Sequence, residues 1–191
     1  MNLPNLLTAS RIFLAPVFFV LFMYGSAMGL PAKLVVPALW VLLIIIELTD
    51  LFDGMAARKL KIVSGFGKLF DPFTDVLARI TYFVCFAWVG IMPLWILVII
   101  LYREFGINFL RMLLVERGIA MGARSGGKLK AVVYVVAGLV SLLVWSLMQF
   151  SMEVPRALSI FVTLSYVLAA ILSVSSFLDY VNQFRKYRAK A

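Results

Sequence analysis

The stretch ITYFVCFAWVGIMPLWILVIILY, residues 80–102, carries no charged side chain, and it decides how many helices the chain forms. Its length exceeds the roughly 20 helical residues that cross a bilayer core of about 30 Å. Gly90 and Pro93 interrupt the stretch, and proline both ends a helix and favours the start of the next. We therefore predict a tight reversal here, with one helix over 68–89 and another after Pro93.

Three other charge-free runs, 12–32, 131–152 and 157–178, are long enough to cross a bilayer as helices. The first run is too long for the apolar region of a cleaved signal peptide. The chain is 64% hydrophobic and only 14% charged, which lies outside the range of soluble domains. In lipid the backbone must satisfy its own hydrogen bonds, so runs without strand-like alternation indicate helices. The sequence therefore predicts an all-α integral membrane protein.

Six transmembrane helices are predicted, preceded by a short amphipathic segment, residues 2–11, that lies along the membrane surface. Gly65 and Gly67 are expected to separate the second helix from the third. No internal repeat or linker divides the chain, so residues 1–191 are expected to form a single domain. The predicted helices run to about 24, from about 32 to the basic stretch at 58–61, over 68–89, from 93 to the loop at 116–128, over 129–150 and over 156–182.

The charge distribution predicts which side each loop faces. Lysine and arginine gather in loops 58–68 and 111–130 and in the C-terminal tail, whereas the opposite loops hold only Lys33 and Arg156. By the positive-inside rule, both termini and the basic loops face the cytoplasm. The net charge of +9 is then explained by loops that face anionic lipid, and no nucleic-acid partner is expected.

Four of the nine acidic residues lie on either side of one basic loop. Asp50 and Asp53 are three residues apart on the second predicted helix, so they share one face. Asp71 and Asp75 are four residues apart on the third helix and also share a face. The short connection makes the two helices antiparallel neighbours, so we expect the four carboxylates to meet.

Positive charge must compensate this cluster, because close carboxylates repel one another and resist burial. Mg²⁺, Mn²⁺ or Ca²⁺ would do so, since hard cations prefer oxygen ligands. Arginines would also do so; the candidates are Arg58, Arg79 and Arg103. Ionisable groups at membrane depth usually mark function, which favours the metal. The chain has no histidine, so a general base must be a carboxylate, a lysine or a tyrosine.

Residues from Asp50 to Arg58 and from Gly67 to Asp75 fill every fixed position of the pattern D-x-x-D-G-x-x-A-R…G-x-x-x-D-x-x-x-D. The chain thus resembles the CDP-alcohol phosphotransferase family, integral membrane enzymes of phospholipid synthesis. The resemblance implies six transmembrane helices and a homodimer. On spacing alone, the small residues beside the acids fit either a bound ligand or close helix packing.

The resemblance also implies roles for individual residues. Two divalent cations, Mg²⁺ first and Mn²⁺ second, would be held by the four aspartates Asp50, Asp53, Asp71 and Asp75. Asp75 would in addition be the general base. The residues implied to bind the nucleotide and the CDP-lipid are Asn5, Thr8, Gly54, Ala57, Arg58 and Gly67.

A second set of residues resembles the bacterial phosphatidylglycerophosphate synthase branch of that family. The set includes the opening P-N-x-x-T-x-x-R, an Arg-Glu pair and a G-K-x-K element. The branch implies CDP-diacylglycerol as donor and glycerol 3-phosphate as acceptor, in a bacterial cytoplasmic membrane. Arginine and lysine suit a phosphate-bearing acceptor; the residues concerned are Arg103, Arg111, Lys128 and Lys130.

Other interpretations stay open. Arg111, Lys128 and Lys130 would also fit basic residues that snorkel to the membrane surface. A second alternative keeps the family reaction but has inositol phosphate, serine or another lipid head alcohol as the acceptor. From a different class, the same acids would serve a divalent-cation transporter.

Several residues depart from the branch, among them Val76, Ala131, Tyr134 and the stretch 108–110, and Glu47 lies outside the family pattern. Val76 stands where a lysine usually follows Asp75, and Arg79, one turn on, is a candidate to supply that charge. Glu47 is expected to pair with an arginine or to tune the metals. Glu104 is expected to position an arginine or to pack at a dimer contact.

Overall fold

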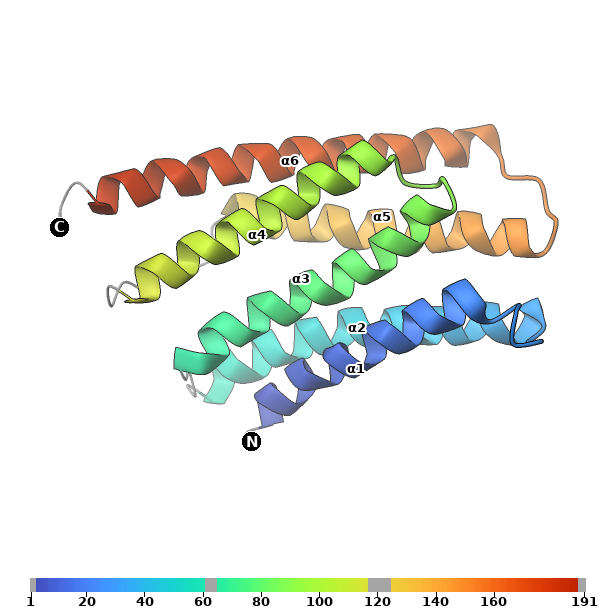
Figure 1. Ribbon diagram of the computed structural model, residues 1–191, viewed down its shortest axis with the longest axis horizontal. Coiled ribbons are helices and arrows are strands. Elements are labelled where there is room, and N and C mark those ends of the chain that lie inside the picture. Colours follow the sequence, from blue (N-terminus) through green and yellow to red (C-terminus); the bar gives the residue numbers. More distant parts are fainter. Residues whose placement is uncertain (1–2, 61–64, 117–124, 189–191) are drawn as a thin grey trace.

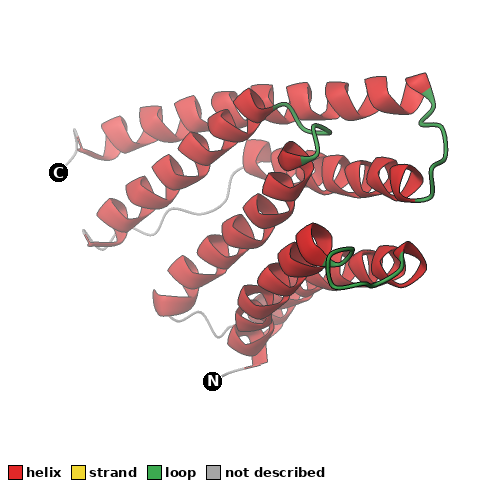
Figure 2. Ribbon diagram, turned by 45° about the vertical axis from the view of Figure 1, so that its right-hand side comes forward, coloured by secondary structure: helices red, strands yellow, loops and turns green. Residues whose placement is uncertain are grey.

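The computed structural model describes the backbone of residues 3–60, 65–116 and 125–188, and the side chains of 8–52, 70–114 and 129–185. Within these ranges all regular secondary structure is helical (Figure 2). The helices are α1 (Leu3–Tyr24), α2 (Ala32–Leu60), α3 (Gly65–Trp88), α4 (Leu94–Glu116), α5 (Ser125–Gln149) and α6 (Arg156–Arg188). The predicted all-α class and the split between Gly90 and Pro93 are therefore confirmed.

Successive helices run in opposite directions along the long axis, and both termini lie at the same end (Figure 1). Helix α1 packs against α2 and α3, while α6 packs against α4 and α5. Helix α3 joins these two groups because it also contacts α4 and α5. The three turns between α1 and α2, α3 and α4, and α5 and α6 gather at the end opposite the termini.

These three turns share one design. Each turn contains a residue in the left-handed region; the residues are Gly29 (φ 75°), Gly90 (φ 77°) and Ser151 (φ 54°). The next N–H then donates to a carbonyl five residues back, from Leu30 to Gly25, Ile91 to Phe86 and Met152 to Leu147. This is the Schellman C-cap. A proline precedes the helix that follows each turn, which starts the new helix within a few residues.

Among the residues that the structure describes, three helical segments are long and apolar enough to cross a bilayer, Ala32–Phe52, Leu129–Gln149 and Arg156–Arg185, and Thr8–Tyr24 is a shorter apolar one. Large apolar side chains also lie exposed on the outer faces, including Phe13 (74%) and Trp88 (75%). Soluble monomers rarely expose such extensive apolar surface. The protein is therefore membrane-embedded, as predicted, whereas the six spans stay a prediction.

The core includes residues of all six helices, and aromatic rings gather where α3 meets α1, α5 and α6. Phe22 of α1 stacks on Trp145 of α5, with ring centroids 4.5 Å apart. Phe83 of α3 contacts Tyr134 and Tyr166 edge-on, at 5.4 and 5.7 Å. Edge-to-face aromatic pairs contribute beyond the apolar area that they bury. These contacts fix α3 between the two helix groups.

Several predicted boundaries differ from the structure. Helix α5 begins at Ser125, inside the predicted loop 116–128, and α6 continues to Arg188 rather than ending at 182. The amphipathic segment 2–11 is not a separate element, because α1 is one continuous helix from Leu3 to Tyr24. Gly65 and Gly67 do not separate two helices, since α3 begins at Gly65 itself. A helix tolerates glycine in its first turn, where several N–H groups have no intrahelical partner in any case.

Gly106 allows α4 and α6 to approach closely. A Cβ atom at Gly106 would lie 2.8 Å from Cε2 of Phe177 on α6. We expect Gly106→Ala to destabilise the protein by about 1–3 kcal/mol, because overpacking forces the ring to move. A lower midpoint of thermal unfolding in detergent would show this. The matched control is Ser175→Ala on the exposed face of α6, which should leave the midpoint unchanged.

Candidate active site

The predicted acidic residues whose side chains the structure describes lie on α2 and α3, toward the end of the bundle where both termini lie (Figure 1). Asp50 lies near the C-terminal end of α2, and Asp71 and Asp75 lie in the first half of α3. The first turns of α1 complete this end, with Thr8 and Arg11 fully buried against the acids. The structure therefore brings three helices to one polar site.

Arg11 of α1 links the acids of the other two helices. Its guanidinium lies 3.5 Å from Oδ1 of Asp50 and 2.9 Å from Oδ1 of Asp75. The Arg11 side chain is 1% exposed, so burial makes these ion pairs stronger than pairs in water. Asp50 and Asp75 therefore converge on a single cationic group, as the sequence predicted for carboxylates on two neighbouring helices.

Thr8 of α1 contacts Asp71, the third of the four predicted aspartates whose side chain is described. Its hydroxyl donates to Oδ1 of Asp71 over 2.9 Å. Thr8 and Arg11 are three residues apart, so they share one face of α1 and reach α2 and α3 together. This side of α1 therefore faces the acids.

Arg79 adds a second cation deeper in the bundle. Its Nη2 atom lies 2.5 Å from Oδ2 of Asp50 and 3.4 Å from Oε2 of Glu47. The hydroxyl of Tyr82 donates to the other oxygen of Glu47 over 3.0 Å. The prediction that Glu47 pairs with an arginine is confirmed, and Arg79 does supply charge to this site.

The arginine network expected as one alternative therefore exists, with a different membership. Arg79 belongs to it and Arg11 joins it, but Arg103 pairs elsewhere because it lies on α4, which packs against α6. Arg58 lies outside the described side chains.

In the described part of the chain no group of three acidic side chains is close enough to hold a metal ion. The side chain of Asp53 lies outside that part. The donor set nevertheless suits a hard cation, since Asp50 and Asp75 already converge on one positive group.

A second polar cluster surrounds Glu104. One of its oxygens accepts hydrogen bonds from Lys130 Nζ and from the hydroxyl of Tyr134, and the other accepts one from Arg103 Nη1 at 2.8 Å. Arg103 also donates to the hydroxyl of Ser176 on α6, over 2.9 Å from Nη2. Glu104 thus positions an arginine and a lysine, which confirms the first of its two predicted roles.

This Glu104 cluster combines two cations and one anion in a buried place. Arg103, Glu104 and Lys130 are each less than a tenth exposed. Two of the four residues predicted to bind the acceptor phosphate therefore lie side by side and keep an excess positive charge. Such an excess is unfavourable at a buried site unless an anion compensates it.

The other two predicted phosphate-binding residues lie apart from this cluster or are not described. Arg111 donates to the hydroxyl of Tyr180 on α6 over 3.1 Å. Arg103 and Arg111 therefore project from a similar side of α4, toward α6, as their eight-residue spacing predicted. The side chain of Lys128 lies outside the described residues, as do those of Asn5, Gly54, Ala57, Arg58 and Gly67.

A small cavity of about 10 Å³ lies between the acidic cluster and the Glu104 cluster. Arg79 and Val76 line it from α3, and Glu104, Lys130 and Tyr134 line it from α4 and α5. This volume is at the lower limit for a single water molecule. The two polar clusters are therefore neighbours, and Val76 lies beside the cations rather than adding one.

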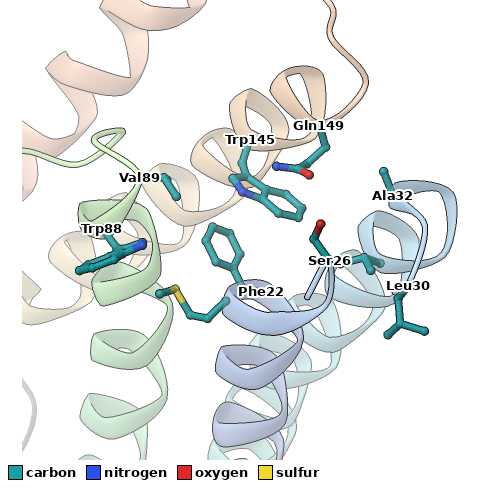
Figure 3. Close-up of a pocket in the computed structure, with 10 residues that line it drawn as sticks. Phe22, Ser26, Leu30, Ala32, Trp88, Val89, Trp145 and Gln149 are labelled. Atoms are coloured by element: carbon teal, nitrogen blue, oxygen red, sulfur yellow. The ribbon is translucent and has the colours of Figure 1, made fainter. Parts of the chain in front are cut away.

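A larger cavity of about 500 Å³ lies at the opposite end of the bundle, away from every acid discussed above (Figure 3). Phe22 and Trp145 form part of its wall, and Ser26 and Gln149 also line it (Figure 3). None of its lining residues is charged. Because phosphoryl chemistry needs charged or metal-binding groups, we place the candidate active site at the end of the bundle that holds the aspartates and the Glu104 cluster, on either side of the small cavity.

The sequence interpretation missed several partners. Arg11, the last residue of the P-N-x-x-T-x-x-R opening, was not recognised as an ion-pair partner of the aspartates. Ser173 and Ser176 were missed entirely, although the structure shows Ser173 bound to Tyr134 and Ser176 bound to Arg103. Two serines one turn apart in an apolar helix are the signal that would have revealed a polar contact between helices.

Comparison with known proteins agrees with these features. The family model described as CDP-alcohol phosphatidyltransferase matches residues 1–175. The CDP-diacylglycerol–glycerol-3-phosphate 3-phosphatidyltransferase of Treponema pallidum (strain Nichols) is 39% identical, over an alignment that covers 96% of this chain and 89% of that protein. The Bacillus subtilis (strain 168) protein of the same name is 33% identical, over 71% of this chain and 74% of its own length. A Mycoplasma genitalium protein of that name is 27% identical, over 99% and 88%.

Proposed function

The chain belongs to the CDP-alcohol phosphatidyltransferase family, a family of transferases, and from this premise we propose that it makes phosphatidylglycerophosphate and CMP from CDP-diacylglycerol and sn-glycerol 3-phosphate. The observation that carries the proposal is the 39% identity to the Treponema pallidum relative over 96% of the chain. The excess positive charge at Arg103 and Lys130 supports an acceptor that carries a phosphate.

We propose that all six helices cross the membrane, with both termini and the acidic end at the cytoplasmic side. The alternating directions of the helices support this, since each turn then lies at one membrane surface (Figure 1). The concentration of lysine and arginine near the acidic end supports the orientation. The homodimer that the resemblance implies stays a prediction.

We propose that divalent cations, Mg²⁺ first, bind at the four aspartates. Asp50, Asp71 and Asp75 are carboxylates at one end of the bundle, and Asp53 lies one turn beyond Asp50 on the same helix. Such cations, when bound, screen the charge of the pyrophosphate and stabilise the departing CMP. Loss of all activity on addition of a chelator, and its return with Mg²⁺, would test this.

The residues of the chain then have separate tasks in a direct displacement. A carboxylate oxygen of Asp75 accepts the proton of the acceptor hydroxyl. The acceptor oxygen forms a bond to the phosphorus that carries the lipid, and the bond from that phosphorus to CMP breaks. Arg11 holds Asp50 and Asp75 at their separation while the charges change. Arg103 and Lys130 bind and orient the acceptor phosphate so that its hydroxyl faces Asp75.

An acceptor panel tests the proposal. Purified protein in detergent receives radiolabelled CDP-diacylglycerol and, in separate reactions, glycerol 3-phosphate, inositol phosphate or serine. We expect labelled lipid product and CMP in the reaction with glycerol 3-phosphate and in neither of the other two reactions. Product with another alcohol and none with glycerol 3-phosphate would overturn the acceptor assignment while leaving the family reaction intact. Ion flux in liposomes without any transfer would instead support the transporter.

A further inference from the structure

We propose that Glu47 is a holding site for the Arg79 side chain, which allows Asp50 to exchange the guanidinium for a divalent cation. This inference rests on the metal binding in the proposed function. Glu47 lies one turn before Asp50 on α2 and outside the family pattern described above. It is therefore not one of the predicted metal ligands. Its role would be to position Arg79.

The geometry places one nitrogen of Arg79 between two acids. Nη2 lies 2.5 Å from Asp50 and 3.4 Å from Glu47. A small rotation of the side chain would therefore move the guanidinium from the first carboxylate toward the second. The Nε atom of Arg79 is buried and has no hydrogen-bond partner among the described residues, so the present position does not satisfy every donor.

Burial makes the second acid necessary. The side chains of Arg79 and Glu47 are each 13% exposed, whereas that of Asp50 is 29% exposed and lies nearer the end of the bundle where both termini lie. If a cation occupied Asp50 and Glu47 were neutral, Arg79 would be left as a buried charge without its closest partners, which is strongly unfavourable. Glu47 removes this penalty because it can neutralise Arg79 in either position.

Tyr82 keeps Glu47 in place for this exchange. The Tyr82 hydroxyl donates to Oε1 of Glu47, which leaves Oε2 directed at Arg79. The Tyr82 ring is 1% exposed and confined, since a Cβ at Gly138 would lie only 3.1 Å from it. Glu47 is therefore held between a fixed hydroxyl and the arginine.

The test measures Mn²⁺ binding to the purified full-length protein in detergent, without substrates, by electron paramagnetic resonance. The variants are Glu47→Gln, Arg79→Gln and the double variant. We expect Glu47→Gln alone to weaken Mn²⁺ binding about tenfold, because Arg79 then competes for Asp50. We expect the double variant to bind Mn²⁺ within about twofold of Arg79→Gln alone, since no competitor remains.

The double variant separates competition from simple attraction. If Glu47 only attracted Mn²⁺ at a distance, its removal would weaken binding equally with and without Arg79, and that result overturns the proposal. The double variant also removes both buried charges together, so it guards against misfolding of a single variant. Tyr82→Phe should weaken binding in the same direction as Glu47→Gln, and Glu153→Gln, at the far end, should not change it.

Two failures are distinguishable. Saturable Mn²⁺ binding by the unaltered protein with no effect of Glu47→Gln overturns this inference and leaves the proposed function standing. No saturable Mn²⁺ binding by the unaltered protein overturns both this inference and the metal part of the proposed function.

Discussion

Asp75→Asn is expected to lower the rate of phosphatidyl transfer by roughly 10³-fold or more, because general-base catalysis typically contributes 10²–10⁴ and asparagine cannot accept the proton. The amide keeps the size of the side chain, so packing on α3 should persist. Arg11 keeps its contact with Asp50 in this variant. The fold should therefore survive while the chemistry is lost.

The measurement is kcat at saturating Mg²⁺ and saturating concentrations of both substrates, so that weaker binding of a metal or substrate does not produce the effect. The control is Glu153→Gln, which removes an exposed acid at the opposite end and should leave kcat unchanged. A fall of less than about tenfold in the Asp75 variant is below the general-base range and would mean that Asp75 is only an ion-pair partner of Arg11.

Periodicity and helix breakers determined most of the fold from the sequence. The Gly90 turn is an example, since the sequence displays both a glycine, which tolerates the positive φ found there, and a proline after it. The convergence of Asp50 and Asp75 also followed from helix spacing and a short connection. The start of α3 at Gly65 did not follow, because local glycine preferences are weaker than the packing that extends a helix.

The source of the compensating charge was harder to predict. Carboxylates attract arginines and divalent cations by the same electrostatics, so composition near the acids does not choose between them. Arg11 was missed as a partner because it is far from the aspartates in sequence, and only the packing of α1 on α2 and α3 brings it there. The contacts of the Glu104 cluster were not predicted for the same reason, since Ser176 and Lys130 come from other helices and only packing brings them to Arg103 and Glu104.

Arg103→Gln is expected to lower kcat/KM for glycerol 3-phosphate by about 10²-fold, since hydrogen bonds to a charged group are worth roughly 1.5–3 kcal/mol. Without Arg103, the Glu104 cluster keeps one anion and one cation, Lys130, and loses its excess positive charge. The acceptor phosphate would then meet a neutral pair. The KM for CDP-diacylglycerol should stay the same, because we predict that the donor is bound by the residues around the aspartates.

A rise in the KM for glycerol 3-phosphate without a rise in the KM for CDP-diacylglycerol would distinguish a role in acceptor binding from a purely structural role. Arg103 also ties α4 to α6 through Ser176, so a purely structural role would lower stability and impair both substrates alike. Ser176→Ala serves as the matched variant, because it removes that tie and keeps the guanidinium on Glu104. If Ser176→Ala raised the KM for glycerol 3-phosphate as much as Arg103→Gln, the positive charge would not be what the acceptor needs. A selective rise in the Arg103 variant, with Arg156→Gln at the far end without effect, would assign the acceptor phosphate to this cluster.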